Sequence, residues 1–224
     1  GGATTDLAGF LAASYLRGVD WIAIPTSLAG MVDAAIGGKT GLNLEAGKNL
    51  IGAFHSPSAV LIDQSFLSSL SQRDLKAGMA EVAKCGFIDD TQILDLIEDK
   101  WRENLSELIY RSIAVKARVV SADFKESDLR EILNYGHTLG HAIEKHSKYS
   151  LRHGEAVALG LRFAARLSFE FSGLSKQHLD RQNQILDTLE LNAKYPRASW
   201  SELLEIMRND KKMRGGRIRF VTLS

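Results

Sequence analysis

Apolar residues follow two different patterns along this chain, and the change falls near residue 68. Residues 7–16 carry apolar side chains three and four positions apart, which predicts an amphipathic helix. Residues 21–25 (WIAIP) and 59–63 (AVLID) are short apolar runs bounded by turn-forming residues, and such runs predict buried strands. A helix that leads into strands is typical of an α/β unit with a parallel sheet.

The rest of the chain has the spacing of helices. Apolar positions recur every three or four residues over 105–113 and 156–164, for example, and no proline interrupts these stretches. The alternating residues 217–221 predict a short final strand. We therefore predict an α/β region over residues 1–68, followed by an essentially all-α region over residues 69–224.

Composition narrows the possible partners of the protein. The 224 residues carry a formal net charge of +1, so no global field favours binding to nucleic acid or to an anionic membrane surface. The single cysteine, Cys85, rules out an intrachain disulfide. The sequence has no apolar stretch of about 18 residues and no signal-peptide pattern, so we expect a cytoplasmic protein with a small-molecule ligand.

Residues 130–144 (REILNYGHTLGHAIE) are the most informative stretch. Treated as one continuous helix, they place four polar side chains capable of binding ligands on one face: Arg130, Asn134, His137 and His141. Gly136 and Gly140 each cost a helix about 1 kcal/mol relative to alanine, which indicates close approach of another backbone or of a ligand. The competing interpretation is a solvated polar face with two incidental histidines.

Two other segments offer metal-ligating groups. His153 precedes the helical run 156–169, and Glu81 lies one helical turn before Lys84, a spacing that also suits a simple surface ion pair. Together with the histidines above, they supply imidazoles and a carboxylate. Three protein ligands and one open position are typical of a catalytic zinc ion, which polarises a substrate oxygen.

The glycine- and lysine-rich residues 37–52 suit an anion. A Walker A motif is excluded, because Asp33 stands where that motif needs a glycine. Lys39, Lys48 and Asn49 nevertheless lie among glycines whose exposed N–H groups can cradle a phosphate, although a flexible surface loop has the same composition. Gly1 and Gly2, ahead of a helix, are a weaker signal for a dinucleotide pyrophosphate.

Taken together, these motifs resemble the 3-dehydroquinate synthases, a family of sugar phosphate cyclases. The matching segments follow the family's order along the whole chain: PTS at 25–27, GGKTGLN at 37–43, GKNLIGAF at 47–54, AEVAK at 80–84, LNYGHTLGHA at 133–142, HGEAV at 153–157 and DKK at 210–212. The resemblance implies conversion of 3-deoxy-arabino-heptulosonate 7-phosphate to 3-dehydroquinate and phosphate, with NAD and Zn2+ or Co2+, in a homodimer. It also implies that residues 1–68 are the C-terminal part of a Rossmann-like NAD-binding domain and that residues 69–224 bind metal and substrate.

The resemblance further assigns roles to individual residues of this sequence. The metal ligands would be Glu81, His137 and His153, and the groups that handle protons would be His141 and Lys84. The substrate would contact Asp33, Lys39, Asn49, Lys116, Arg130, Asn134 and Lys212, together with Arg17 of a neighbouring subunit. Arg130 would suit the substrate carboxylate. NAD would contact Gly1, Gly2, Asp6, Thr26, Ser27, Lys39 and Lys48.

Family members carry a further N-terminal segment, the first half of the cofactor domain. We therefore expect residues 1–224 alone to bind NAD weakly and to have little activity. Other interpretations remain open: a 2-deoxy-scyllo-inosose synthase, or a non-catalytic metal-binding fragment. Glycerol and iron-dependent alcohol dehydrogenases have a similar fold but need no anion cradle.

Overall fold

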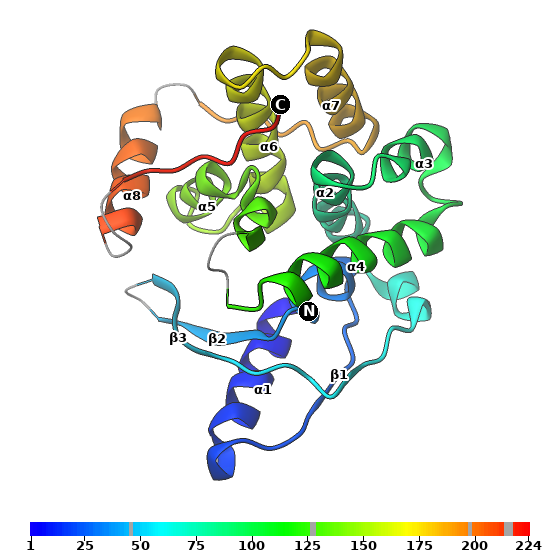
Figure 1. The fold of residues 1–224 in the computed structure, drawn as a ribbon, viewed down its shortest axis with the longest axis vertical. Coiled ribbons are helices and arrows are strands. Elements are labelled where there is room, and N and C mark those ends of the chain that lie inside the picture. The colour runs from blue at the N-terminus through cyan, green and yellow to red at the C-terminus, as the bar shows by residue number, and fades with distance from the viewer. Residues whose placement is uncertain (45–46, 126–128, 197–198, 213–216) are drawn as a thin grey trace.

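The computed structural model describes residues 1–44, 47–125, 129–196, 199–212 and 217–224, and at Asn43, residues 47–49 and residues 210–212 it describes the main chain only. An α/β part comes first along the chain and a helical part follows, as the sequence predicts (Figure 1). The α/β part comprises α1 (Gly2–Ser14), η1 (Tyr15–Arg17), β1 (Ile22–Ala23), η2 (Gly30–Ala34), β2 (Lys39–Leu44), β3 (Gly47–Phe54), β4 (Ala59–Val60) and η3 (Gln64–Ser69). The helical part comprises α2 (Gln72–Ile88), α3 (Gln92–Lys100), α4 (Leu105–Ala122), η4 (Leu129–Asn134), α5 (His137–His146), α6 (His153–Phe171), α7 (Lys176–Thr188) and α8 (Trp200–Lys212).

The two strands predicted from apolar runs pair in parallel, with Ile22 opposite Ala59. Each is only two residues long, and burial along them is uneven. Ala23 is buried, whereas Ile22 and Leu61 are more than half exposed. The prediction of buried strands is therefore wrong for these side chains, because within the described residues β1 and β4 pair only with each other.

The sequence gives no clear signal for a hairpin, yet β2 and β3 form one. They pair antiparallel, with Gly41 opposite Gly52. A Cβ atom on Gly52 would lie 2.3 Å from the carbonyl oxygen of Thr40, so the two backbones approach more closely than any side chain permits. The glycines that suggest a phosphate loop thus also have a structural purpose in the hairpin.

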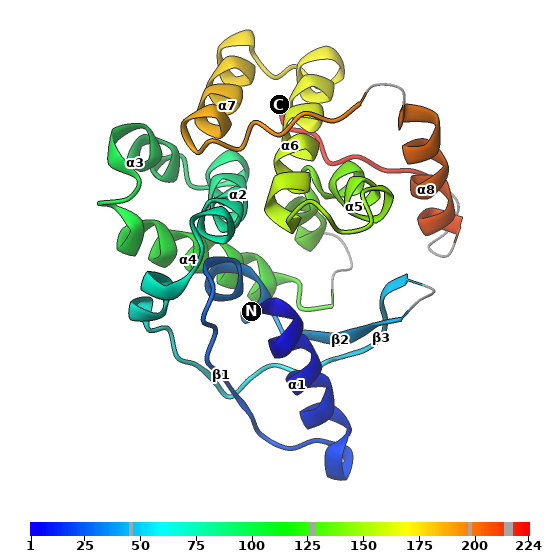
Figure 2. The same ribbon diagram turned by 180° about the vertical axis from the view of Figure 1, so that it is seen from behind.

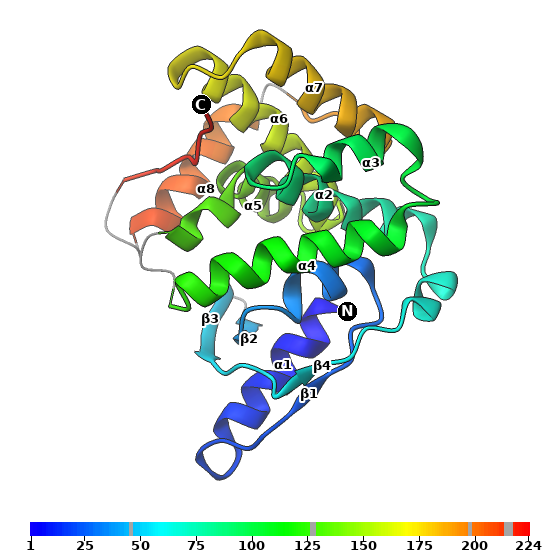
Figure 3. The same ribbon diagram turned by 45° about the vertical axis from the view of Figure 1, so that its right-hand side comes forward.

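Helix α2 is the centre of the helical part. It contacts α3, α4, α6 and α7, and eleven of its residues, from Leu75 to Gly86, are buried. Figures 2 and 3 show α4 lying between the other helices and the α/β part. Among the described residues, no helix combines the length and the apolar character needed to cross a lipid bilayer.

The predicted continuous helix over residues 130–144 is wrong. The 3-10 helix η4 ends at Asn134, and α5 begins at His137 after Gly136, whose φ is +76°. A Cβ on Gly136 would lie 2.7 Å from the backbone nitrogen of Leu161, and one on Gly160 would lie 1.9 Å from the Gly136 carbonyl oxygen. The expected close backbone approach is therefore present, and it turns the chain between η4 and α5.

The predicted strand over residues 217–221 is also absent, since residues 217–224 are extended without strand pairing. This segment instead lies against helices of the helical part. The Thr138 hydroxyl donates to the Arg219 carbonyl oxygen at 2.9 Å, and the backbone N–H of Leu223 donates to the Ser168 hydroxyl at 3.0 Å. The alternating apolar residues thus reflect packing of an extended chain on helices.

Candidate active site

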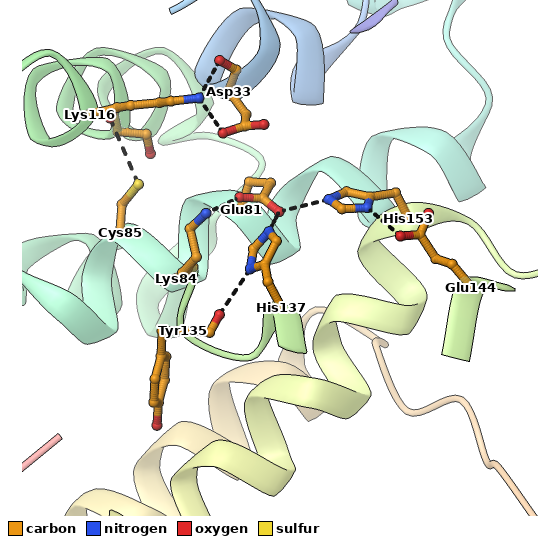
Figure 4. Close-up of polar contacts among 10 residues, drawn as sticks. Asp33, Glu81, Lys84, Cys85, Lys116, Tyr135, His137, Glu144 and His153 are labelled. Carbon is orange, nitrogen blue, oxygen red and sulfur yellow. Dashed lines mark hydrogen bonds and ion pairs between the residues drawn. The ribbon is translucent and has the colours of Figure 1, made fainter. Parts of the chain in front are cut away.

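A carboxylate and two imidazoles converge where α2, α5 and α6 meet (Figure 4). Glu81 lies in the middle of α2, and His137 and His153 are the first residues of α5 and α6. The Glu81 Oε1 atom lies 3.2 Å from the Nε2 atom of each histidine. The candidate ligand atoms of all three residues lie within 4.8 Å of one another, although up to 72 positions separate them along the chain.

This donor set fits a divalent ion of the zinc type. Bonds of about 2.0–2.1 Å in a tetrahedron separate neighbouring ligand atoms by about 3.3 Å, close to both carboxylate–imidazole distances. The Nδ1 atom of His137 lies 3.0 Å from the carbonyl oxygen of Tyr135, which can only accept a hydrogen bond. This carbonyl favours the tautomer with the proton on Nδ1, in which the Nε2 lone pair faces the candidate metal position.

Glu81 and Lys84 form a buried pair, so the alternative of a surface ion pair is wrong. Their side chains are 2% and 3% exposed, and Lys84 Nζ lies 2.5 Å from Glu81 Oε2. Burial favours the neutral acid, but Lys84 and His137 outweigh it and hold the pKa of Glu81 well below its usual value. Burial likewise opposes the ammonium form, but Glu81 and Asp33 raise the pKa of Lys84.

His153 lies between two carboxylates. Its Nδ1 is 3.1 Å from Glu144 Oε2, and its Nε2 faces Glu81. Burial alone would lower the pKa of His153, but contacts with Glu144 and Glu81 raise it to about 10. The surroundings of this ring therefore attract positive charge.

His141 lies on α5 one turn after His137 and is exposed. Its ring centroid is 5.3 Å from that of His137 and 5.9 Å from that of His153. It forms a second cluster of potential ligands with Glu144 and His153. An exposed imidazole next to the candidate metal ligands can exchange protons with both solvent and a bound molecule.

Asp33 and Lys116 bring the α/β part to the edge of this cluster. The Lys116 ammonium, on α4, donates to both the main-chain carbonyl and the carboxylate of Asp33, in η2. Burial would raise the pKa of Asp33, but Lys116 outweighs burial and lowers it. Figure 4 places this pair beside Glu81 and Lys84.

Most residues expected to contact NAD gather around the start of α1. A Cβ on Gly1 would lie 3.2 Å from Ser27 Oγ, and one on Gly2 would lie 3.1 Å from Ala34 Cβ. No side chain caps the start of α1, where the N–H groups of Thr4 and Thr5 donate to the Gly1 carbonyl oxygen. Burial and the Asp33 carboxylate raise the pKa of Asp6 to about 6, and Thr26, next to Ser27, is exposed.

Arg130 is held by main-chain carbonyl groups. It is 2% exposed, and its guanidinium donates to the carbonyl oxygens of Phe124 at 2.6 Å and Gly37 at 3.0 Å. The arginine thereby connects the chain before β2 to the chain after α4. These two bonds use two of the five N–H donors of the guanidinium.

The remaining candidate substrate residues are spread more widely. Lys39 is exposed at the start of β2, and Asn134 is half-buried at the end of η4. Arg17 is exposed beyond the end of α1, which points away from α2, α5 and α6 in Figures 1–3. The side chains of Lys48, Asn49 and Lys212 lie outside the described residues.

Glu144 is the site residue that the sequence reasoning missed. It is buried, and it contacts His153 through a carboxylate oxygen. A signal was present, because Glu144 lies seven positions after His137 and three after His141, on the same face of α5.

Comparison with known proteins extends over the whole chain. The family described as 3-dehydroquinate synthase N-terminal matches residues 1–77, and that described as 3-dehydroquinate synthase C-terminal matches residues 78–213. The 3-dehydroquinate synthase of Pseudarthrobacter chlorophenolicus is 58% identical over 100% of this chain and 63% of its own length. That of Streptomyces avermitilis is 54% identical with the same coverage, so the chain spans less than two thirds of these relatives.

Solved structures of sugar phosphate cyclases have the same fold. A 2-epi-5-epi-valiolone synthase from Streptomyces hygroscopicus, with NAD+ and Zn2+ bound, matches with a TM-score of 0.88 and 28% identity, over 100% of this chain and 68% of that protein. A 2-deoxy-scyllo-inosose synthase, complexed with carbaglucose-6-phosphate, NAD+ and Co2+, matches with a TM-score of 0.80 and 27% identity, over 92% and 59%. On the strength of both family matches, the chain belongs to the 3-dehydroquinate synthase family.

Proposed function

We propose that this protein converts 3-deoxy-arabino-heptulosonate 7-phosphate into 3-dehydroquinate and phosphate, a reaction of the shikimate pathway. The observation that carries the proposal is the convergence of Glu81, His137 and His153 next to the Asp33–Lys116 pair. This arrangement occurs in a chain that is 54–58% identical to curated 3-dehydroquinate synthases.

Glu81, His137 and His153 would hold one divalent ion, with Zn2+ or Co2+ suited to two nitrogen donors and one oxygen donor. Gly1, Gly2, Asp6, Thr26 and Ser27, with Lys39 and Lys48 nearby, would contact NAD at the start of α1. When bound, NAD supplies reversible hydride transfer, and the metal ion polarises substrate oxygens.

His141 and Lys84 would handle protons. His141 is exposed on the face of α5 that carries the metal ligand His137, so it can remove a substrate proton and release it to solvent. Lys84 is buried beside Glu81, and its ammonium would donate a proton toward negative charge that develops on a bound substrate oxygen and so stabilise that charge.

A phosphate and a carboxylate distinguish the proposed substrate. The substrate phosphate would be bound by Lys39, Asn49, Asn134 and Lys212. The substrate carboxylate would lie next to Lys116 and Arg130. Asp33 would orient the Lys116 ammonium, to which it is already bonded. Arg17 ends η1, which follows the end of α1 that points away from α2, α5 and α6, so we assign it to the phosphate site of a partner subunit in a homodimer.

A second candidate activity is that of a 2-deoxy-scyllo-inosose synthase, because such an enzyme shares the fold and binds a sugar phosphate analogue. The identities of 54–58% to 3-dehydroquinate synthases, against 27% to this enzyme, favour the first candidate. A substrate comparison separates them, since one substrate is a sugar acid phosphate and the other carries no carboxylate.

The direct test is phosphate release from the heptulosonate phosphate by the full-length gene product. We expect release that requires NAD, is lost on treatment with a chelator and returns with Zn2+ or Co2+. Glucose 6-phosphate serves as the substrate without a carboxylate. Phosphate release from glucose 6-phosphate, and none from the heptulosonate, would overturn the proposal in favour of the second candidate.

A further inference from the structure

Glu144 is a buried acid with no part in the proposed chemistry. It lies on α5 with 3% exposure, and its Oε2 atom is 3.1 Å from Nδ1 of His153. Burial of a carboxylate is costly unless its charge is compensated, so a buried acid that faces a candidate metal ligand calls for an explanation.

The two histidines of the candidate metal cluster are held in different ways. The His137 ring is 10% exposed, and the rigid backbone carbonyl of Tyr135 fixes its Nδ1. The His153 ring is 37% exposed and begins a helix, so burial restrains it less. The side-chain hydrogen bonds of His153 run from its two ring nitrogens, to Glu81 on one side and to Glu144 on the other, while its ring also lies near the rings of His137 and His141.

A carboxylate beside Nδ1 favours the protonated form of that nitrogen, which leaves the Nε2 lone pair free. Nε2 is the atom of His153 that lies 3.2 Å from Glu81 Oε1, inside the candidate metal cluster. The negative charge of Glu144 also makes the imidazole a stronger electron donor. One residue would thus set the ring orientation, the tautomer and the donor strength of the more exposed ligand.

We infer that Glu144 is a positioning residue that acts through His153 to hold the metal ion, an inference that rests on the proposed metal site. Glu144 is not one of the three proposed ligands, and it contacts one of them, His153. Its removal leaves all three ligands in the chain and frees the ring of His153 to rotate.

The test is a chelator competition for Co2+ and Zn2+ on the purified full-length protein, with the visible spectrum of the Co2+ form as a second measurement. Four variants are compared: E144A, E144Q, H153A and E202Q. Glu202, on α8, is the matched control. Its carboxylate contacts a ring nitrogen of His146, which lies on α5 like Glu144 but away from the metal cluster.

We expect E144A to weaken metal binding about 10–100-fold and to change the Co2+ spectrum, as loss of a partner behind a metal ligand does. E144Q should weaken binding several-fold, because the amide oxygen still accepts from Nδ1 but carries no charge. E202Q should leave both measurements unchanged. A merely structural role would lower the melting temperature of the metal-free protein without altering the Co2+ spectrum.

Unchanged metal affinity and an unchanged spectrum in E144Q and in folded E144A, with clear loss in H153A, would overturn the role of Glu144 alone. If E144A does not fold, the result for E144Q decides. Failure of the unaltered protein to bind Co2+ or Zn2+, or binding by H153A that equals it, would instead overturn the proposed metal site.

Discussion

At the residue scale, the site is organised around one carboxylate. Glu81 presents Oε1 to two imidazoles and Oε2 to the Lys84 ammonium, and all of these groups except the more open His153 are buried. Each oxygen thus has a separate purpose, one toward the candidate metal ion and one toward a fixed positive charge.

Removal of the Glu81 charge should therefore have two separable effects. Glu81→Gln should abolish tight metal binding and destabilise the metal-free protein by about 3 kcal/mol, because it leaves a buried ammonium without its closest counter-charge. The measurement is urea unfolding of the metal-free protein. Addition of Lys84→Met should recover much of the stability but none of the metal affinity. Equal stability of the single and double variants would contradict this view of the pair.

Asp6 gives a pH dependence that can be measured. Its folded-state pKa, about 6, lies above the usual value of 3.8, so the folded protein binds the extra proton between these values and loses stability as pH rises through about 6. Asp6→Asn should stabilise the protein by about 1 kcal/mol at about pH 8, after allowance for solvent screening, and have almost no effect at about pH 4. Urea unfolding at both pH values is the measurement, and a gain of equal size at both would refute the assignment.

At the element scale, two helices that each begin with a candidate ligand are brought together by glycine. Gly136 turns the chain into α5, and Gly160 lets α6 approach the same point. The positions of His137 and His153 therefore depend on this backbone contact as much as on their own side chains.

Gly136→Ala should lower the free energy of unfolding by much more than the left-handed backbone at this position alone would account for. Gly173 is the matched control, because its φ of +85° is similar but a Cβ there meets no atom within 4 Å. We expect a loss of about 1 kcal/mol in unfolding free energy for Gly173→Ala and of more than about 3 kcal/mol for Gly136→Ala, which adds a clash with Leu161. Metal affinity should fall in Gly136→Ala only. Similar losses for both variants would show that the helix contact is unimportant.

Sequence periodicity was informative where packing is helical. The pattern over 105–113 lies within α4 and that over 156–164 within α6. The break after Asn134 was not visible, because 3-10 and α-helical turns accept the same residues and the cause, Leu161, is 25 positions beyond Gly136. The hairpin of β2 and β3 was missed because glycines that allow two strands to approach have low intrinsic strand preference.

The same limits apply to the candidate site. The spacing of His137 and His141, and the His-Gly-Glu start of α6, pointed to ligands without knowledge of the fold. The buried state of Glu81 and Lys84 could not be read from their one-turn spacing, which surface pairs share. The bonds of Arg130 to Phe124 and Gly37 depend on the chain path between distant elements and leave no local signal.

At the scale of the whole molecule, the candidate site lies between the α/β part and the helical part. Lys116 and Asp33 bridge the two parts, and Figure 3 shows α4 running along the boundary. The end of α1 that precedes η1 and Arg17 points away from α4 in Figure 3, which is why we assign Arg17 to a partner subunit.

The proposed homodimer predicts complementation between two inactive variants of the full-length protein. A mixture of Arg17→Ala and His141→Ala chains should form dimers in which one site has both an intact His141 and the partner subunit's Arg17. Phosphate release should therefore return once subunits exchange, up to about half of the unaltered activity per mixed dimer. No recovery in mixtures shown to exchange subunits would contradict a shared site.

The proposed chemistry depends most on one ion held by Glu81, His137 and His153, and the metal content per chain tests this directly. We predict one Zn2+ or Co2+ per chain in the purified protein by elemental analysis, and less than about a tenth of that in His137→Ala after the same dialysis. A His137→Ala protein that retains its full complement of metal would rule out a metal ion held by these three residues.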